Sequence, residues 1–115
     1  MITLYGIPNC DTVKKARAWL TASGAEYAFH DFKKQGVPDD LTHWVDALGW
    51  EPLLNRKGTT WRKLDATVQG SVTNAESALA LMQTQASVIK RPVVVWATGQ
   101  ITVGFDAAEW EKRLA

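Results

Sequence analysis

The pattern at residues 1–32 constrains the fold more than any other part of the chain. Residues 2–5 alternate in polarity like a short strand, a Gly/Pro turn follows, and residues 11–23 have helical spacing that Gly24 can end. One face of this helix would hold Val13, Ala16 and Leu20. Residues 27–32 alternate again and are rich in aromatic side chains, which predicts a second strand. A strand, a helix and a strand in this order predict two parallel strands.

The last third of the chain predicts a hairpin followed by a helix. Residues 93–96 form a short β-branched run, the turn at Thr98 and Gly99 follows, and residues 101–103 form a second run. Asp106 can cap a final helix that extends to Leu114. A hairpin requires antiparallel pairing, so the complete sheet should be mixed.

The middle of the chain reads as helical. A helix should begin at Asp39 or Asp40 and end at Gly49, because apolar residues recur there at helical intervals. We also expect a short helix at 52–55, a loop at 58–60, and a helix capped by Thr73, which has Glu76 at capping-box spacing. The 115 residues fit one domain. In this domain, residues 1–35 and 86–115 would form the α/β core and residues 36–85 a helical insertion.

Cys10 is the single cysteine, and it lies where the first strand meets the first helix. Unpaired N–H groups at a helix N-terminus favour an anion such as a thiolate, and Lys14, Lys15 and Arg17 add cations while Asp11 opposes them. The thiol is therefore either a nucleophile or a small buried hydrophobe. One cysteine excludes an intrachain disulfide and a multi-cysteine metal site, and suits a reducing compartment.

The charge distribution is more informative than the net charge of +1, which argues against a nucleic-acid surface. Residues 52–64 contain no acid, and neither do residues 77–105. The basic side chains of these two segments are Arg56, Lys57, Arg62, Lys63, Lys90 and Arg91. If the segments meet, they form an anion-attracting surface; otherwise they are a solvated basic face.

Other motifs are absent from the sequence. It contains no dinucleotide or phosphate-binding glycine motif, no metal-ligand spacing and no catalytic carboxylate pair, so we expect no bound cofactor and no metal. His30 and His43 have no motif around them and are interpreted as structural or surface residues. There is no signal region and no apolar stretch of membrane-spanning length, so we expect a cytoplasmic protein with no membrane partner.

Three segments together resemble the ArsC/Spx family, and in particular its YffB-type branch. They are residues 5–10 (YGIPNC), 54–64 (LNRKGTTWRKL) and 89–93 (IKRPV). The order of elements likewise resembles the thioredoxin-like, or glutaredoxin-like, architecture: a mixed four-stranded sheet with a helical insertion between strands 2 and 3.

The resemblance also implies roles for individual residues. It implies that Cys10 is the nucleophile, that Arg91 binds an anionic substrate and that Pro92 follows a cis bond. Arg56 is the nearest match to a second anion-binding arginine, and Arg62 lies in the most family-specific segment. Asn9 either contributes to substrate binding or simply caps the helix.

The chain departs from arsenate-reducing members of the family at three positions. It has Gly6 where they have a histidine, Val13 where they have a serine, and Val103-Gly104-Phe105 where they have a further arginine. Arsenate is therefore not the expected substrate. The second cysteine of the Cys-x-x-Cys motif of Spx regulators is also replaced by Val13, which excludes an internal redox switch.

Two functions follow from these observations. The first is a thiol-dependent reductase in which Cys10 attacks an oxidised sulfur or a small oxyanion. Because a lone cysteine needs an external thiol to turn over, glutathione is the expected co-substrate, and a glutaredoxin is a candidate partner. The carboxylates of glutathione would suit arginine and lysine side chains. The alternative is a Spx-like module that binds a protein such as RNA polymerase, with Cys10 incidental.

Overall fold

A computed structural model describes residues 1–114, which divide into two compact units: residues 1–35 with 91–114, and residues 36–90. Residues 86–90 were expected in the α/β core, but they belong to the helical unit. The segment that follows residue 85 is tied to the helical unit, because Asn55 N donates to the Val88 carbonyl and Lys90 N donates to the Leu53 carbonyl, both at 2.7 Å.

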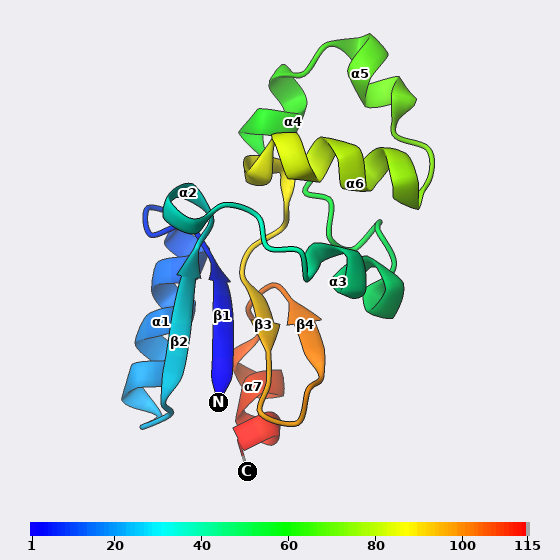
Figure 1. The fold of residues 1–115 in the computed structure, drawn as a ribbon. Coiled ribbons are helices and arrows are strands. Elements are labelled where there is room, and N and C mark those ends of the chain that lie inside the picture. Colours follow the sequence, from blue (N-terminus) through cyan, green and yellow to red (C-terminus); the bar gives the residue numbers. More distant parts are fainter. Residues whose placement is uncertain (115) are drawn as a thin grey trace. The chain divides into compact units, whose positions relative to one another are not determined.

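The α/β unit contains the predicted mixed sheet. Its strands are β1 (Ile2–Gly6), β2 (Tyr27–Asp31), β3 (Val93–Val95) and β4 (Ile101–Val103), in the order β2-β1-β3-β4. β1 pairs in parallel with β2, and the other two pairings are antiparallel. Figure 1 shows β1 lying between β2 and β3. The strand–helix–strand and hairpin expectations are both confirmed.

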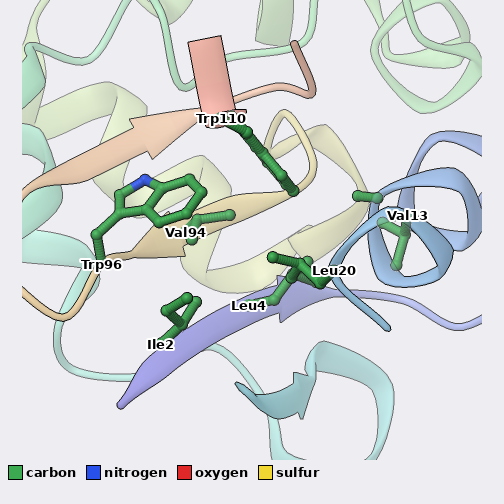
Figure 2. Close-up of a cluster of buried hydrophobic side chains, with 8 residues drawn as sticks. Ile2, Leu4, Val13, Leu20, Val94, Trp96 and Trp110 are labelled. Atoms are coloured by element: carbon green, nitrogen blue, oxygen red, sulfur yellow. The ribbon is translucent and has the colours of Figure 1, made fainter. Parts of the chain in front are cut away.

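Two helices cover one face of this sheet, namely α1 (Asp11–Ala22) and α7 (Ala107–Leu114). The strands and helices contribute to one buried cluster, made of Ile2, Leu4, Val13, Ala16, Leu20, Val94, Trp96 and Trp110. In Figure 2, the side chains of the two tryptophans extend over the same side of the sheet as Leu4 and Val94. Asp106 caps α7 as expected, since its Oδ1 accepts from Glu109 N at 3.2 Å.

The helical unit contains α3 (Leu41–Leu48), α4 (Thr59–Lys63), α5 (Ala66–Ser71), α6 (Ala75–Thr84) and the 3₁₀ turn η1 (Ala86–Val88). α3 was predicted, and it ends at Gly49, whose φ of 83° suits a residue without Cβ. Its N-cap is Asp40. No helix of the described residues has the length and apolar character needed to cross a membrane.

Three local expectations in this unit are wrong. No helix forms at 52–55: residues 52 and 53 belong to a turn, and Leu54 instead forms a bridge with Ile89. The expected loop at 58–60 is instead the start of α4. The cap of α6 is Asn74 rather than Thr73, since Asn74 and Ser77 form the reciprocal capping box.

Candidate active site

Cys10 occupies the N-cap position of α1, directly after the loop that leaves β1. Its backbone is extended, with φ of −94° and ψ of 126°, and its carbonyl accepts from Lys14 N at 2.9 Å, the first bond of the helix. The thiol is half-buried. Its side chain forms no capping hydrogen bond, yet the backbone N–H groups of Thr12 and Val13 act on its sulfur.

The surroundings of the Cys10 sulfur favour its ionised form. Burial raises the pKa of this thiol, but the other contributions outweigh burial and place the pKa below the ordinary value. These are the backbone N–H of Val13, a hydrogen bond from the Arg91 side chain, the charge of Arg91, and the backbone N–H of Thr12. The lowered pKa supports the nucleophilic interpretation of Cys10.

Arg91 is the cation that reaches the thiol, whereas the family resemblance implied for it only a role in binding an anionic substrate. It is half-buried and follows directly on the helical unit, and its bond to the buried Pro92 is cis, which confirms the expected isomer. β3 begins at the next residue and pairs with β1, so that Tyr5 lies opposite Val93. This pairing fixes Arg91 beside the end of β1, and the loop that leads to Cys10 starts there.

The other cations expected near the thiol are arranged differently. Lys14 and Lys15 are exposed, and neither is among the groups that lower the pKa of Cys10. Arg17 turns away to β2: its Nε donates to the Tyr27 hydroxyl at 3.0 Å, and its guanidinium lies 4.1 Å from the ring centre of Phe29. The expectation that Arg17 acts on the thiol is therefore wrong.

Asn9 does not cap the helix, because Cys10 holds that position. Its side-chain Oδ1 instead accepts a hydrogen bond from Lys33 Nζ at 3.3 Å. Lys33 lies on α2 (Phe32–Gln35), a single turn that follows β2. No sequence motif singles out Lys33, since it is one of two consecutive surface lysines and lies 24 positions from Asn9.

Two departures from the arsenate-reducing pattern form one packing feature. A Cβ built on Gly6 would lie 2.7 Å from Cγ2 of Val13, which is fully buried. Gly6 is therefore required by space, not by an unusual backbone conformation. The third departure is also built into the core: the ring of Phe105 packs edge-on against Trp110 with centroids 4.8 Å apart.

Arg56 and Arg62 belong to the helical unit. Arg56 is exposed and lies over the ring of Trp50, with its guanidinium carbon 5.4 Å from the ring centre. It lines a pocket of about 250 Å³ together with Glu51, Pro52, Leu54, Asn55, Lys57 and Lys90. Arg56 and Lys57 of the first acid-free segment thus meet Lys90 of the second, and the carboxylate-bearing Glu51 lines the same pocket. Arg62 is exposed in the last turn of α4. The substrate-binding roles of both arginines stay predictions.

A mixed four-stranded sheet with a helical insertion and a thiol at the N-terminus of α1 are the features of a thioredoxin-like protein of the ArsC type. Residues 5–113 match the profile of the ArsC family, so the chain belongs to the ArsC family, and its fold is thioredoxin-like.

Several relatives resemble the chain over nearly its whole length. A solved structure described as a YffB protein is 41% identical, with a TM-score of 0.92 and 100% of both chains covered. A solved arsenate reductase related protein from Brucella melitensis is 47% identical, with a TM-score of 0.75 and 96% and 92% of the chains covered. The transcriptional regulator Spx 1 of Lactococcus lactis subsp. lactis is 27% identical over 95% of this chain and 85% of its own length. The expected ArsC/Spx family with a YffB-type branch is confirmed.

Proposed function

We propose that this protein is a glutathione-type, thiol-dependent reductase that acts through Cys10. The observation that carries the proposal is the environment of the sulfur, where two backbone N–H groups and the Arg91 side chain stabilise a thiolate. Since the thiolate and not the thiol is the nucleophile, a lowered pKa increases the reactive fraction at neutral pH. Membership of the ArsC family supports the same chemistry.

The proposed chemistry is thiol–disulfide exchange. The Cys10 thiolate attacks one sulfur of an oxidised substrate; the substrate S–S bond breaks, a mixed disulfide forms at Cys10, and the released thiolate takes a proton from water. A glutathione-type thiolate then attacks the substrate sulfur of the mixed disulfide; a disulfide between glutathione and that part of the substrate forms, the bond to Cys10 breaks, and Cys10 leaves as the thiolate. Because Cys10 is the single cysteine, the second thiol must come from outside the chain, either free or on a glutaredoxin.

Arginine side chains would hold the anionic part of the substrate. Arg91 already lies at the sulfur. Arg56 and Arg62 are the further arginines proposed to bind the substrate, and Asn9 is proposed as an additional polar contact. Guanidinium groups suit carboxylates because they can donate two parallel hydrogen bonds. The basic pocket around Arg56 supports an anionic ligand for the helical unit.

Arsenate is disfavoured as the oxyanion substrate. Val13 supplies no hydroxyl to the thiolate. Its buried side chain also fills the space next to Gly6, so a histidine side chain has no room at position 6. Residues 103–105 stand where arsenate-reducing members have a further arginine, and in this chain Phe105 packs against the ring of Trp110 instead. Each of these differences removes a group that would stabilise charge on the thiolate or the oxyanion.

Intact-mass analysis after exposure to oxidised glutathione tests the proposal. We expect one glutathione adduct per chain in the wild type, removal of the adduct by reduced glutathione, and no adduct in Cys10→Ser. Arg91→Met should form the adduct more slowly at neutral pH. A wild-type thiol that alkylates with the pH midpoint of free cysteine, about 8.5, and forms no adduct would refute the proposal.

The similarity to a Spx regulator favours one second candidate, a protein-binding module. In this case Cys10 would be dispensable, and the chain would bind purified RNA polymerase equally well as wild type and as Cys10→Ser. Biolayer interferometry with the purified enzyme measures this directly. Binding that survives Cys10→Ser, together with an unreactive thiol, would replace the reductase proposal.

A further inference from the structure

We propose that Lys33 is a substrate-selecting residue, which with Asn9 binds a carboxylate of the thiol or disulfide that reacts at Cys10. The inference rests on the reductase proposed above and names the charge of its substrate. It comes from the contact between α2 and the loop before Cys10, which nothing in the sequence motifs assigns. Both segments belong to the α/β unit, and Figure 1 shows α2 beside the start of α1.

Lys33 is held in place by its own turn of helix. The carboxylate of Asp31, only 6% exposed, accepts from Lys33 N at 2.8 Å, and Asp31 N donates to Gln35 Oε1 at 3.0 Å. Phe32, which begins the turn, is buried against the ring of Tyr5. The backbone of Lys33 is therefore anchored through its N–H within a turn that the Gln35 side chain closes, while its own side chain is exposed and extends to Asn9.

The polar groups that this pair offers to a ligand are donors. The Asn9 amide oxygen accepts from Lys33, so the groups with remaining capacity are chiefly the Asn9 amide nitrogen and the other N–H bonds of the ammonium group. A cluster of donors with one positive charge binds an acceptor-rich anion, and a carboxylate is such a group. Both side chains are exposed, so a ligand can reach them.

The position of the pair matches an extended thiol. Asn9 is one residue from Cys10, and each carboxylate of glutathione is carried by the residue next to its thiol-bearing residue. The glycine of glutathione follows the cysteine through an ordinary peptide bond, as Cys10 follows Asn9, so an extended substrate whose sulfur meets Cys10 would carry its carboxylate one residue away from the reacting sulfur, on the scale of the Asn9–Cys10 step.

Lys33 and Arg91 also act on different atoms. Burial raises the pKa of Cys10, and the groups that lower it are the Val13 and Thr12 N–H groups and Arg91, but not Lys33. The Lys33 charge is thus placed to act on the ligand beyond the sulfur. This separation predicts that Lys33 affects which disulfide reacts, while Arg91 affects how reactive the thiol is.

The test compares the rate of mixed-disulfide formation at Cys10 with three disulfides, followed by intact-mass analysis. The reagents are oxidised glutathione, which is anionic, hydroxyethyl disulfide, which is neutral, and cystamine, which is cationic. For Lys33→Gln we expect a loss of about threefold to tenfold with oxidised glutathione, no change with hydroxyethyl disulfide, and a gain with cystamine. Lys33→Arg should retain most of the wild-type rate, and added salt should reduce the difference.

Lys34→Gln is the matched control, because it removes the same charge from the neighbouring exposed residue of α2. Equal losses in Lys33→Gln and Lys34→Gln would mean a general field effect and would overturn the inference. Equal losses with the anionic and neutral reagents would also overturn it, since Lys33 would then only position the Cys10 loop. A wild-type chain that reacts with none of the three reagents refutes the proposed reductase itself. Reaction of the wild type with the neutral reagent but not with oxidised glutathione overturns the carboxylate site alone.

Discussion

Substituting Gly6 by alanine should destabilise the protein because the new methyl group has no room. The Cβ would lie 2.7 Å from Cγ2 of Val13 and 3.4 Å from its Cγ1, so atoms must move by roughly 1 Å to restore ordinary carbon contacts of about 3.5–4.0 Å. Val13 cannot rotate out of the way easily, because a β-branched side chain in a helix has one strongly preferred rotamer. Instead, β1 and α1 must separate where the chain leads into Cys10.

The expected cost is a balance of two terms. Overpacking a well-filled core costs about 1–3 kcal/mol. Alanine also restricts the unfolded chain more than glycine does, which offsets about 0.4–1 kcal/mol where the native backbone tolerates it. Gly6 has no positive φ, so its backbone accepts alanine and the second term applies. We expect Gly6→Ala to lower the free energy of unfolding by about 1–2 kcal/mol.

A double-mutant cycle with Val13→Ala isolates the steric contact. Urea unfolding, with the slope m unchanged, gives the four free energies. Val13→Ala alone should also destabilise, since it removes buried methyl groups, but in that background the methyl group added by Gly6→Ala has space and should cost little or nothing. The coupling should thus be at least about 1 kcal/mol. Strictly additive losses, or a Gly6→Ala variant as stable as the wild type, would refute the proposed contact.

Four further outcomes are expected. Arg91→Met should raise the pH midpoint of Cys10 alkylation, whereas Lys14→Met, which removes an exposed cation, should hardly move it; equal shifts would contradict the role of Arg91. Because the pKa of Cys10 is lowered in the folded chain, the thiolate contributes stability above the unfolded-state value of about 8.5, and this contribution is lost as the pH falls through the folded value. The stability advantage of the wild type over Cys10→Ser should accordingly be larger at high pH than in mild acid, as measured by chemical unfolding. Arsenate turnover should be negligible even with glutathione and a glutaredoxin supplied, and robust turnover that needs Cys10 would show the substrate class to be wrong. Asn74→Ala should cost about 1 kcal/mol of unfolding free energy and Thr73→Ala clearly less, which equal losses would contradict.

The elements of the α/β unit could be predicted because their signals are local and periodic. The alternation in β1 and β2, the apolar face of α1 and the cap at Asp106 all depend on neighbouring residues. The chain between Gly49 and α6 was predicted less well. There the residues make non-local bonds, as Leu54 does with Ile89, and these bonds override the short-range preference for a helical turn.

The candidate site divides in the same way. Cys10 could be found from its place between a strand and a helix, and Arg91 from its motif before Pro92. The orientation of Arg17 could not be predicted from α1, because its side chain contacts the Tyr27 hydroxyl and the Phe29 ring, and both residues belong to β2. Lys33 reaches Asn9 only because β2 runs parallel to β1 and delivers α2 to the end of the sheet where Cys10 lies.

The packing of Gly6 against Val13 bears on how the thiol of this chain is tuned. A side-chain hydroxyl or an imidazole at these two positions would have to replace atoms that now fill the space between β1 and α1. The contributions that lower the pKa of Cys10 come instead from the backbone N–H groups of α1 and from Arg91, which lies just before β3. Backbone N–H groups stabilise a thiolate whatever the substrate, whereas an additional cation or hydroxyl would favour a particular oxyanion. This arrangement suits sulfur exchange, in which the charge stays on small, polarisable sulfur atoms, better than reduction of a doubly charged oxyanion. Substrate choice would then depend on groups that contact the substrate beyond its sulfur, which is the role proposed above for Lys33 and Asn9.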